Sequence, residues 1–316
     1  MTKNVCASAL WEVTKNNGKK LGRWRILKVY LRPEYEKDRS EIKANTLVNV
    51  MLRLDFTPLI SSDKVALFLQ DELCSKGFEY REDFLQESEM RLNDPIEKDD
   101  RIFPRQIENE RVYRFVLDSK IFSFSRFFII YQVSPFSKNV NEDIEYFSQL
   151  INKIKEVSPY LNIKRLGVRK TNLVIAEDFQ QLFNCFREDY LPISAKNKVA
   201  SEDFGVFESQ ESFFDRNIQI ACNVRKRLDA GEMQISNEKK EVVEEKDVLR
   251  FILELESYSR GDKALNNLSD YVDILTQMNA GVFLLYLEHL TPNFLLHLKA
   301  GITNDLLSGV KLNVEV

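Results

Sequence analysis

The alternation of apolar and polar residues at 163–174 constrains the fold of this chain more than any other stretch. Its sequence, IKRLGVRKTNLV, places successive side chains on opposite faces, as a β-strand does. The stretch before it, which starts at Asn141, repeats apolar residues at helical spacing until Ser158 and Pro159 stop it. An amphipathic helix followed by a strand predicts a mixed α+β fold.

Elements of the same kind precede this pair. Residues 47–56 alternate like a strand, Ser61, Ser62 and Asp63 can cap a helix that follows, and Gly77 is placed to end that helix. The other predicted elements are a helix at 64–76, a charged irregular insertion at 81–109, and strands at 111–117 and 121–133. The resulting order, strand–helix–strand–strand–helix–strand, predicts a ferredoxin-like βαββαβ first half.

The second half predicts an antiparallel β-meander followed by C-terminal helices. Its strands are expected at 204–214, 217–228 and 248–258, with the charged run 238–247 as a solvated hairpin loop. Thr291 and Pro292 begin the last helix, and Gly301 ends it. The predicted organisation is an N-terminal extension at 1–40 with a strand at 21–31, a ferredoxin-like half at 41–176, a short helix and linker at 177–200, and the meander with its helices at 201–316.

Composition limits the classes of function. The chain has 316 residues with 45 basic and 49 acidic side chains, so its net charge of −4 creates no global field for DNA or anionic membranes. The N-terminus lacks the apolar stretch of a signal peptide, and no apolar run approaches a membrane span. The four cysteines are widely spaced: Cys6, Cys74, Cys185 and Cys222. We therefore expect free thiols in a reducing cytoplasm.

Three segments together resemble one protein family. They are FSRFFI at 124–129, RLGVR at 165–169 followed by Asn172, and the Phe-rich helical segment at 279–298 with its Leu-Thr-Pro break. The second is similar to the signature Arg-(Ile/Leu)-Gly-(Leu/Val)-Arg-Tyr-x-Asn of a sporadically distributed family of uncharacterised bacterial proteins. The chain departs from that signature at Lys170 and Thr171. The resemblance implies no reaction, and the patchy distribution implies an association with mobile defence or toxin-linked loci.

The arginines of the central strand have two interpretations. Arg165 and Arg169 flank Gly167 on one face, where the missing side chain leaves room for an anion that guanidinium groups can grip. Together with Asn172 and Arg126 they form the candidate ligand site. The alternative is that both arginines pair with acids from neighbouring strands. Asn172 is expected to be a turn residue near the end of the strand.

A second hypothesis places nucleic acid on the sheet. Phe122, Phe124 and Phe128 are predicted to share a face with Arg126, and aromatic side chains beside a cation can stack bases. The basic residues that would accompany them are Lys164, Arg225, Lys226 and Arg227. The alternative is that the phenylalanines pack in the core and the basic residues are exposed strand ends.

The chain offers few groups for catalysis or metal binding. Its two histidines, His289 and His297, are eight residues apart across a proline, and no zinc, nucleophile-elbow or phosphate-loop motif occurs. A Cys222–His289 pair would depend on folding alone. Glu254 and Glu256 share a strand face, as nuclease carboxylates do, but they also fit a solvent-exposed face. We predict no catalytic residue, metal or cofactor.

The function predicted from the sequence is that of a non-catalytic binding protein of the bacterial cytoplasm. It would act through contact with another protein, as a partner, sensor or immunity component of a mobile defence or toxin-linked system, with a homodimer as a further option. The alternative is a nucleic-acid or nucleotide-binding protein that uses the basic and aromatic sheet face.

Overall fold

The computed structural model describes residues 40–44, 46–84, 111–134, 140–191, 206–215, 220–236, 242–260, 265–268 and 270–302. The strand predicted at 21–31 lies outside the described residues, as do the N-terminal extension apart from residue 40, most of the charged insertion and most of the linker.

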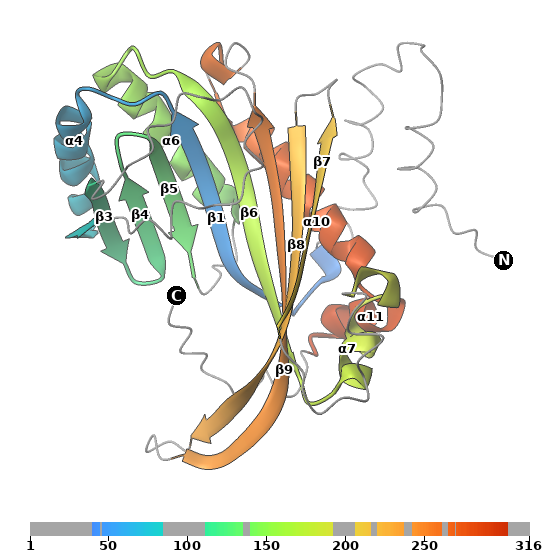
Figure 1. Ribbon diagram of the computed structural model, residues 1–316. Helices are drawn as coiled ribbons and strands as arrows, with labels where there is room; N and C mark the ends of the chain where they lie inside the picture. The colour runs from blue at the N-terminus through green and yellow to red at the C-terminus, as the bar shows by residue number, and fades with distance from the viewer. Residues whose placement is uncertain are drawn as a thin grey trace, which may run out of the picture.

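The described residues form one nine-stranded sheet with helices against it (Figure 1). Neighbouring strands are antiparallel throughout, in the spatial order β2-β3-β4-β5-β1-β6-β9-β8-β7. The strands are β1 (Leu47–Phe56), β2 (Glu79–Phe84), β3 (Arg111–Leu117), β4 (Lys120–Phe124), β5 (Phe128–Val133), β6 (Ile163–Ala176), β7 (Phe207–Asp215), β8 (Ile220–Ser236) and β9 (Val242–Arg260). The helices are α4 (Ser62–Cys74), α6 (Val140–Val157), α7 (Phe179–Cys185), the 3-10 turn η1 (Glu188–Tyr190), α10 (Val272–His289) and α11 (Pro292–Ala300). The mixed α+β class is confirmed.

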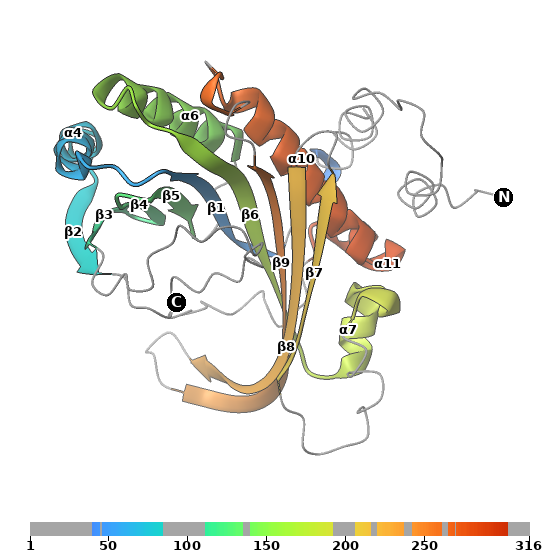
Figure 2. The ribbon, with the colours of Figure 1, turned by 45° about the horizontal axis from the view of Figure 1, so that its top comes forward.

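One face of the sheet, which we call the helix face, holds the apolar core. In β1 the alternation places Val50, Leu52 and Leu54 on this face, where they are buried under α4, α6 and α10. A second core cluster lies where Phe251 and Leu253 of β9 meet α7, α10 and α11. Figure 2 shows the described helices on this side of the sheet. Among the described residues, no helix has the length and apolar character to cross a membrane.

The opposite face is the polar face. Strand alternation and the cross-strand register assign to it Arg53 of β1, Arg165 and Arg169 of β6, Glu256 of β9 and Arg225 of β8. The polar face joins the two halves of the chain, because β6 of the first half pairs with β9 of the second half. One sheet therefore contains strands from both sides of the predicted linker. The division of the chain into four regions stays a prediction.

Two predictions for the first half are wrong. The single strand at 121–133 is the hairpin β4–β5: the backbone turns at 125–127, where Ser125 N donates to Phe128 O at 3.0 Å. The Ser125 hydroxyl also accepts from Phe127 N at 3.1 Å, so a local side-chain bond stabilises a turn without Gly or Pro. The insertion predicted to be irregular begins with β2, which pairs with β3 along its length.

Some helix ends have side-chain caps or a glycine stop of the expected kind, and others do not. Asp178 caps α7 by accepting from Gln181 N at 2.8 Å, and Thr291 caps α11 in the same way for Phe294 N at 3.1 Å. Gly77 takes φ +91 after α4, as expected for a helix stop. Ser61, however, makes no side-chain cap bond.

The long hairpin of the second half extends further than predicted. The register of β8 and β9 runs from Ile220 opposite Ser259 to Ser236 opposite Val242. Residues 242–247, predicted to be a solvated loop, are therefore strand. Residues 238–241 of the predicted loop lie outside the described residues.

Candidate binding surface on the polar face

The arginines of β6 meet an acid from the neighbouring strand. Glu256 of β9 lies opposite Arg169, and its Oε1 accepts from Arg165 Nη2 at 2.7 Å and from Arg169 Nη2 at 3.3 Å. Arg165 and Glu256 are both buried. The structure therefore favours the ion-pair interpretation, and contradicts the expectation that Glu256 faces solvent.

Side chains from β1 and β8 extend this network of ion pairs and hydrogen bonds. Asn223 of β8 donates to Glu256 Oε2 at 3.0 Å, and Arg53 Nε donates to Asp55 at 2.7 Å. Asp55 Oδ2 lies 3.9 Å from Arg165 Nη1. We call this set the inner cluster: Arg53, Asp55, Arg165, Arg169, Asn223 and Glu256.

The inner cluster keeps its carboxylate charged. Burial alone would raise the pKa of Glu256, but the guanidinium groups of Arg165 and Arg169 and the amide of Asn223 outweigh it, so the pKa lies below its usual range. A buried carboxylate with these partners stabilises the arginines around it and occupies the donors that an anionic ligand would need.

Gly167 leaves no room for a ligand. A Cβ built on it would lie 2.8 Å from the Cβ of Tyr258, so the close approach of β9 explains the glycine. The guanidinium of Arg165 lies over the Tyr258 ring at 4.1 Å from its centre. The space predicted beside the arginines is thus filled by Tyr258.

The remaining members of the predicted ligand site lie elsewhere. Asn172 is a buried residue within β6, not a turn residue, and its Oδ1 accepts from Thr46 Oγ1 at 3.3 Å while its Nδ2 donates to Leu253 O at 3.4 Å. Strand alternation places it on the helix face, away from Arg165. Arg126 is exposed in the turn between β4 and β5, with its guanidinium 4.7 Å from the centre of the Phe127 ring.

The aromatic face predicted for nucleic acid is not formed. Phe122 and Phe124 have exposed fractions of 0% in the core of the helix face. Phe128 follows the turn and lies on the polar face, where the Arg53 guanidinium is 5.6 Å from its ring centre. The prediction that these three share one face with Arg126 is wrong, because the turn at 125–127 resets the alternation.

The basic run Arg225, Lys226, Arg227 is divided between the two faces. Lys226 lies on the helix face, almost fully buried, with Nζ 2.6 Å from Glu211. Lys164, the other predicted basic contact, is partly buried at the start of β6. Alternation thus prevents the run from acting as a single patch.

Arg225 and Arg227 lie on the polar face, in a second group of ion pairs. Arg225 Nε lies 2.7 Å from Glu208 of β7, and its Nη1 lies 3.5 Å from Glu254 of β9. Asp229 is buried and accepts from Arg227 Nε at 3.0 Å and from Arg250 Nε at 2.7 Å. We call this set the outer cluster: Glu208, Arg225, Arg227, Asp229, Arg250 and Glu254.

The outer cluster differs from the inner one in exposure. The side chains of Arg225, Arg227 and Arg250 have exposed fractions of 36%, 43% and 48%. Sequence reasoning missed Asp229 and Arg250. The signal that would have found them is the register of β8 against β9, which sets Asp229 opposite Arg250.

Three side chains considered for catalysis, those of His289, Cys185 and Cys222, lie on the helix side of the sheet. His289 is buried: its Nδ1 is 2.6 Å from Leu285 O, and its ring lies 4.3 Å from that of Tyr190. Burial lowers the pKa of His289 to about 4 and raises the pKa of the Cys185 thiol to about 11. The Cys222 thiol donates to Ser257 Oγ at 3.8 Å.

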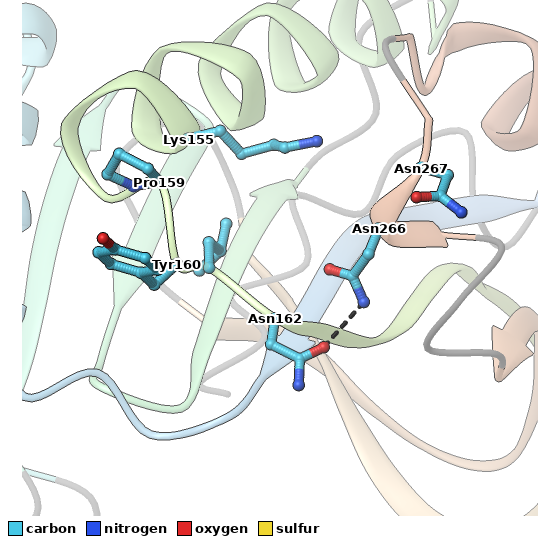
Figure 3. Close-up of a pocket in the computed structure, with 7 residues that line it drawn as sticks. Lys155, Pro159, Tyr160, Asn162, Asn266 and Asn267 are labelled. Carbon is cyan, nitrogen blue, oxygen red and sulfur yellow. Dashed lines mark hydrogen bonds between the residues drawn. The ribbon is translucent and has the colours of Figure 1, made fainter.

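A shallow hollow lies at the end of α6 (Figure 3). It measures about 430 Å³, and its polar lining comes from Lys155, Asn162, Asn266 and Asn267. Asn266 donates to Asn162 Oδ1 at 2.8 Å and exchanges two further bonds with the backbone of Ile163. Lys155 Nζ donates to Leu268 O and Tyr271 OH, both at 3.1 Å. These bonds connect residues 265–268 to the end of α6 and to the start of β6.

The described side chains form no metal centre: within those residues, no three His, Cys, Asp or Glu gather closely enough to hold an ion. Comparisons of the chain with protein-family models and with curated proteins find no match. The outer cluster is therefore taken as the candidate site on its geometry alone.

Proposed function

We propose that the protein is a non-catalytic binding protein and that the outer cluster is its contact surface for an acidic region of a partner protein. The observation that carries the proposal is the exposure of Arg225, Arg227 and Arg250 on the polar face. Arginine has a planar fork of donors and a weakly hydrated charge, so it is favoured where a carboxylate is bound across an interface.

The charge balance of the cluster favours protein over nucleic acid. Its three arginines face three carboxylates, Glu208, Asp229 and Glu254. Phosphate backbones are bound by surfaces with a clear surplus of positive charge, whereas protein interfaces mix both signs in a complementary pattern. Burial of Phe122 and Phe124 also removes the stacking platform from the nucleic-acid alternative.

The states of the buried groups support a non-catalytic role. The raised pKa of Cys185 keeps its thiol protonated, and only a thiolate is a strong nucleophile. The lowered pKa of His289 leaves it neutral near pH 7, with its ring tilted against that of Tyr190. Both groups serve the packing of α7 and α10 in this proposal.

The proposal also retains two finer hypotheses. A ferredoxin-like interpretation of the first half is supported by the position of β1 between β5 and β6, the two strands that α6 connects. The family resemblance at Arg165, Gly167 and Arg169 supports a bacterial cytoplasmic setting linked to mobile defence or toxin systems, and the partner would then be a component of such a system.

Affinity purification from the native host tests the proposal. Tagged wild-type protein would be compared with Arg225→Gln/Arg227→Gln, a variant in which Asp229 keeps Arg250 as its partner. We expect specific proteins to be recovered with the wild type and depleted with the variant, while recovered nucleic acid stays at background. The matched control, Lys76→Gln/Lys153→Gln, removes two cations beside Glu72 on α4, away from the polar face.

Three results would contradict the proposal. One is the same protein set with the arginine variant as with the wild type. Another is nucleic acid as the main species recovered, which would favour the alternative. The third is robust turnover by the purified wild type in an untargeted hydrolysis screen.

A further inference from the structure

Strand β7 is an edge strand of the sheet. It is the last strand in the spatial order, at the end of the sheet farthest from α4 (Figure 1). Within the part of the chain that the structure describes, β7 pairs only with β8, over the nine residues from Phe207 to Asp215. The backbone groups of an edge strand that point away from its neighbour are a template to which a further strand can add.

The sequence of β7 lacks the features that usually protect such an edge. Edge strands are commonly shielded by proline, by lysine or by a bulge. Residues 206–215, VFESQESFFD, contain no proline and no basic residue, and the register of β7 against β8 has no shift. Glu208 and Glu211 are paired with Arg225 and Lys226 of β8, at 2.7 and 2.6 Å. Their charges are balanced within the molecule and do not oppose an approaching strand.

Exposed apolar side chains lie at both ends of this strand. Val206, Phe213 and Phe214 have exposed fractions of 59%, 53% and 50%. Phe213 lies opposite Cys222 on the helix face, and Phe214 lies opposite Ala221 on the polar face. A further strand beside β7 would cover apolar residues on both faces at once, which a partner docked on one face would not.

A second copy of β7 matches these residues in one register. When two identical strands pair antiparallel about a two-fold axis perpendicular to the sheet, the residue on the axis faces itself. With Gln210 on the axis, Phe207 faces Phe213 of the second copy, and Val206 faces Phe214 of the second copy. Symmetry makes each of these contacts twice. The apolar side chains of the two strands are then paired on both faces of the joined sheet.

The neighbouring registers do not give this match. With Gln210 on the axis, both glutamates of the strand face serines. With Ser209 on the axis, Phe207 faces Glu211, and with Glu211 on the axis, Phe207 faces Asp215. Larger shifts also leave fewer residues paired. The pattern of side chains along β7 therefore selects the register centred on Gln210.

We propose that two copies of this chain pair through β7 in an antiparallel arrangement, with Gln210 on the two-fold axis, so that their sheets join into one. The inference goes beyond the proposed function, because the edge of the strand makes the contact and the outer arginines do not. Since the axis is perpendicular to the sheet, the polar faces of both copies point the same way. The dimer thus presents two outer clusters on one side to a partner.

Sedimentation velocity of the full chain over a range of concentrations tests this dimer. Val206→Lys and Phe214→Glu each place a charge opposite an apolar side chain, at both symmetric contacts. Each variant alone is expected to dimerise at least about tenfold more weakly than the wild type, because two cross-strand contacts are lost. The matched control is Leu67→Lys, the same kind of change at an apolar residue of α4 that is 64% exposed, and it should leave the dissociation constant unchanged.

Mixing the two variants gives a sharper result. The introduced lysine of one variant then faces the introduced glutamate of the other, and the remaining contact between Val206 and Phe214 is native. The mixture is therefore expected to recover the dimer. Recovery also shows that both variants are folded.

A cysteine at the axis tests the register. In the proposed dimer the two copies of residue 210 lie opposite each other, with Cα atoms about 4.5–5.5 Å apart, within the range of a disulfide. Oxidation of Gln210→Cys with diamide is expected to link the two copies. In Ser212→Cys the new thiols lie roughly 13 Å apart along the strands, so this variant should link no more than the wild type with its native cysteines.

A wild type that stays monomeric at every concentration leaves the edge of β7 to a different occupant and would overturn the proposal. So would a dimer that either charged variant leaves unchanged, or a mixture that fails to recover the dimer although circular dichroism shows both variants folded. Equal linking of the two cysteine variants would overturn the register and the proposal with it. These failures are distinct from failure of the proposed function, which is measured by the host proteins that Arg225 and Arg227 retain.

Discussion

The inner and outer clusters are built from the same types of side chain on the same face of one sheet, yet they differ in burial. In each, one carboxylate is shared between two arginines: Glu256 between Arg165 and Arg169 of β6, and Asp229 between Arg227 of β8 and Arg250 of β9. The inner cluster lies where β1, β6, β9 and β8 run side by side, and Tyr258 covers Arg165. The outer cluster lies towards the edge of the sheet, beside the first residues of β7. Under the proposed function, burial decides which arginines hold the sheet together and which remain for a partner.

The two clusters are also expected to differ in how much they contribute to the stability of the fold. Removing one charge from a buried pair leaves its partner without compensation, whereas the loss of an exposed pair is absorbed by water. The inner cluster should therefore dominate stability, and the outer cluster should dominate binding.

The largest predicted effect is the loss of the inner carboxylate. Glu256→Gln leaves Arg165 and Arg169 poorly compensated in a buried site, so the free energy of unfolding should fall by about 3–5 kcal/mol. Glu254→Gln, two residues away on the same face and strand, should cost less than about 1 kcal/mol. Urea unfolding of both variants measures the two losses in the free energy of unfolding. Equal losses would contradict the predicted difference between the clusters.

As pH falls, protonation of His289 on the helix face should destabilise the fold before protonation of Glu256 in the inner cluster does. The pKa of His289 falls from 6.5 to about 4 on folding, so the folded state binds this proton less readily than the unfolded chain. Stability is then lost as pH falls from about 6.5 to about 4, by roughly 3 kcal/mol in total. Chemical denaturation across that range should show a shallower slope for His289→Gln, and an unchanged slope would contradict the assignment.

The lowered pKa of Glu256 has the same sign but acts at lower pH. Its contribution is present above its ordinary pKa of 4.5 and is lost as pH falls through the lower folded value. In Glu256→Gln that additional loss below pH 4.5 should be absent.

Two glycines, Gly167 and Gly231, contrast a tight contact with an ordinary one. Gly167→Ala places a Cβ 2.8 Å from Tyr258 Cβ, so the strands must shift, at about 1–3 kcal/mol. At Gly231 the nearest atoms are those of the Arg250 guanidinium at 3.5 Å, an ordinary contact with a flexible side chain. Gly231→Ala should therefore be neutral or stabilising by about 0.5 kcal/mol. Thermal melting compares the two, and a neutral Gly167→Ala would show that the inner cluster is loosely packed.

The smallest predicted effect is on the stability of the outer cluster. Arg225→Gln removes exposed pairs with Glu208 and Glu254, so the free energy of unfolding should change by less than about 1 kcal/mol. The change should shrink further at high salt, because exposed charges are screened. A large, salt-independent loss would mean that the outer cluster is scaffold as well.

Local periodicity in the sequence was sufficient to predict several elements. The spacing of Ile144, Phe147, Ile151 and Ile154 identified α6, and all four are buried. The alternation at 163–174 identified β6. The break between β4 and β5 was missed because Ser125, Arg126 and Phe127 contain no Gly or Pro, and the turn depends on a serine side chain.

The clusters could be predicted only in part. The sequence offered an ion pair for Arg165 without its partner, because Glu256 lies 91 residues away and the pairing requires the register of β6 against β9. For the same reason Arg225 and Arg227 were grouped with Lys226, which alternation turns to the other face. Long-range register, which no short window contains, decides both clusters.

The central claim is that the outer arginines are available to a partner and the inner ones are not. Timed modification of the native protein with phenylglyoxal, followed by peptide mass spectrometry, measures this for each arginine. We predict that Arg225, Arg227 and Arg250 react at least about tenfold faster than Arg165 and Arg169, as their exposed fractions imply. Equal rates for the two groups, or faster modification of Arg165 and Arg169, would contradict the account.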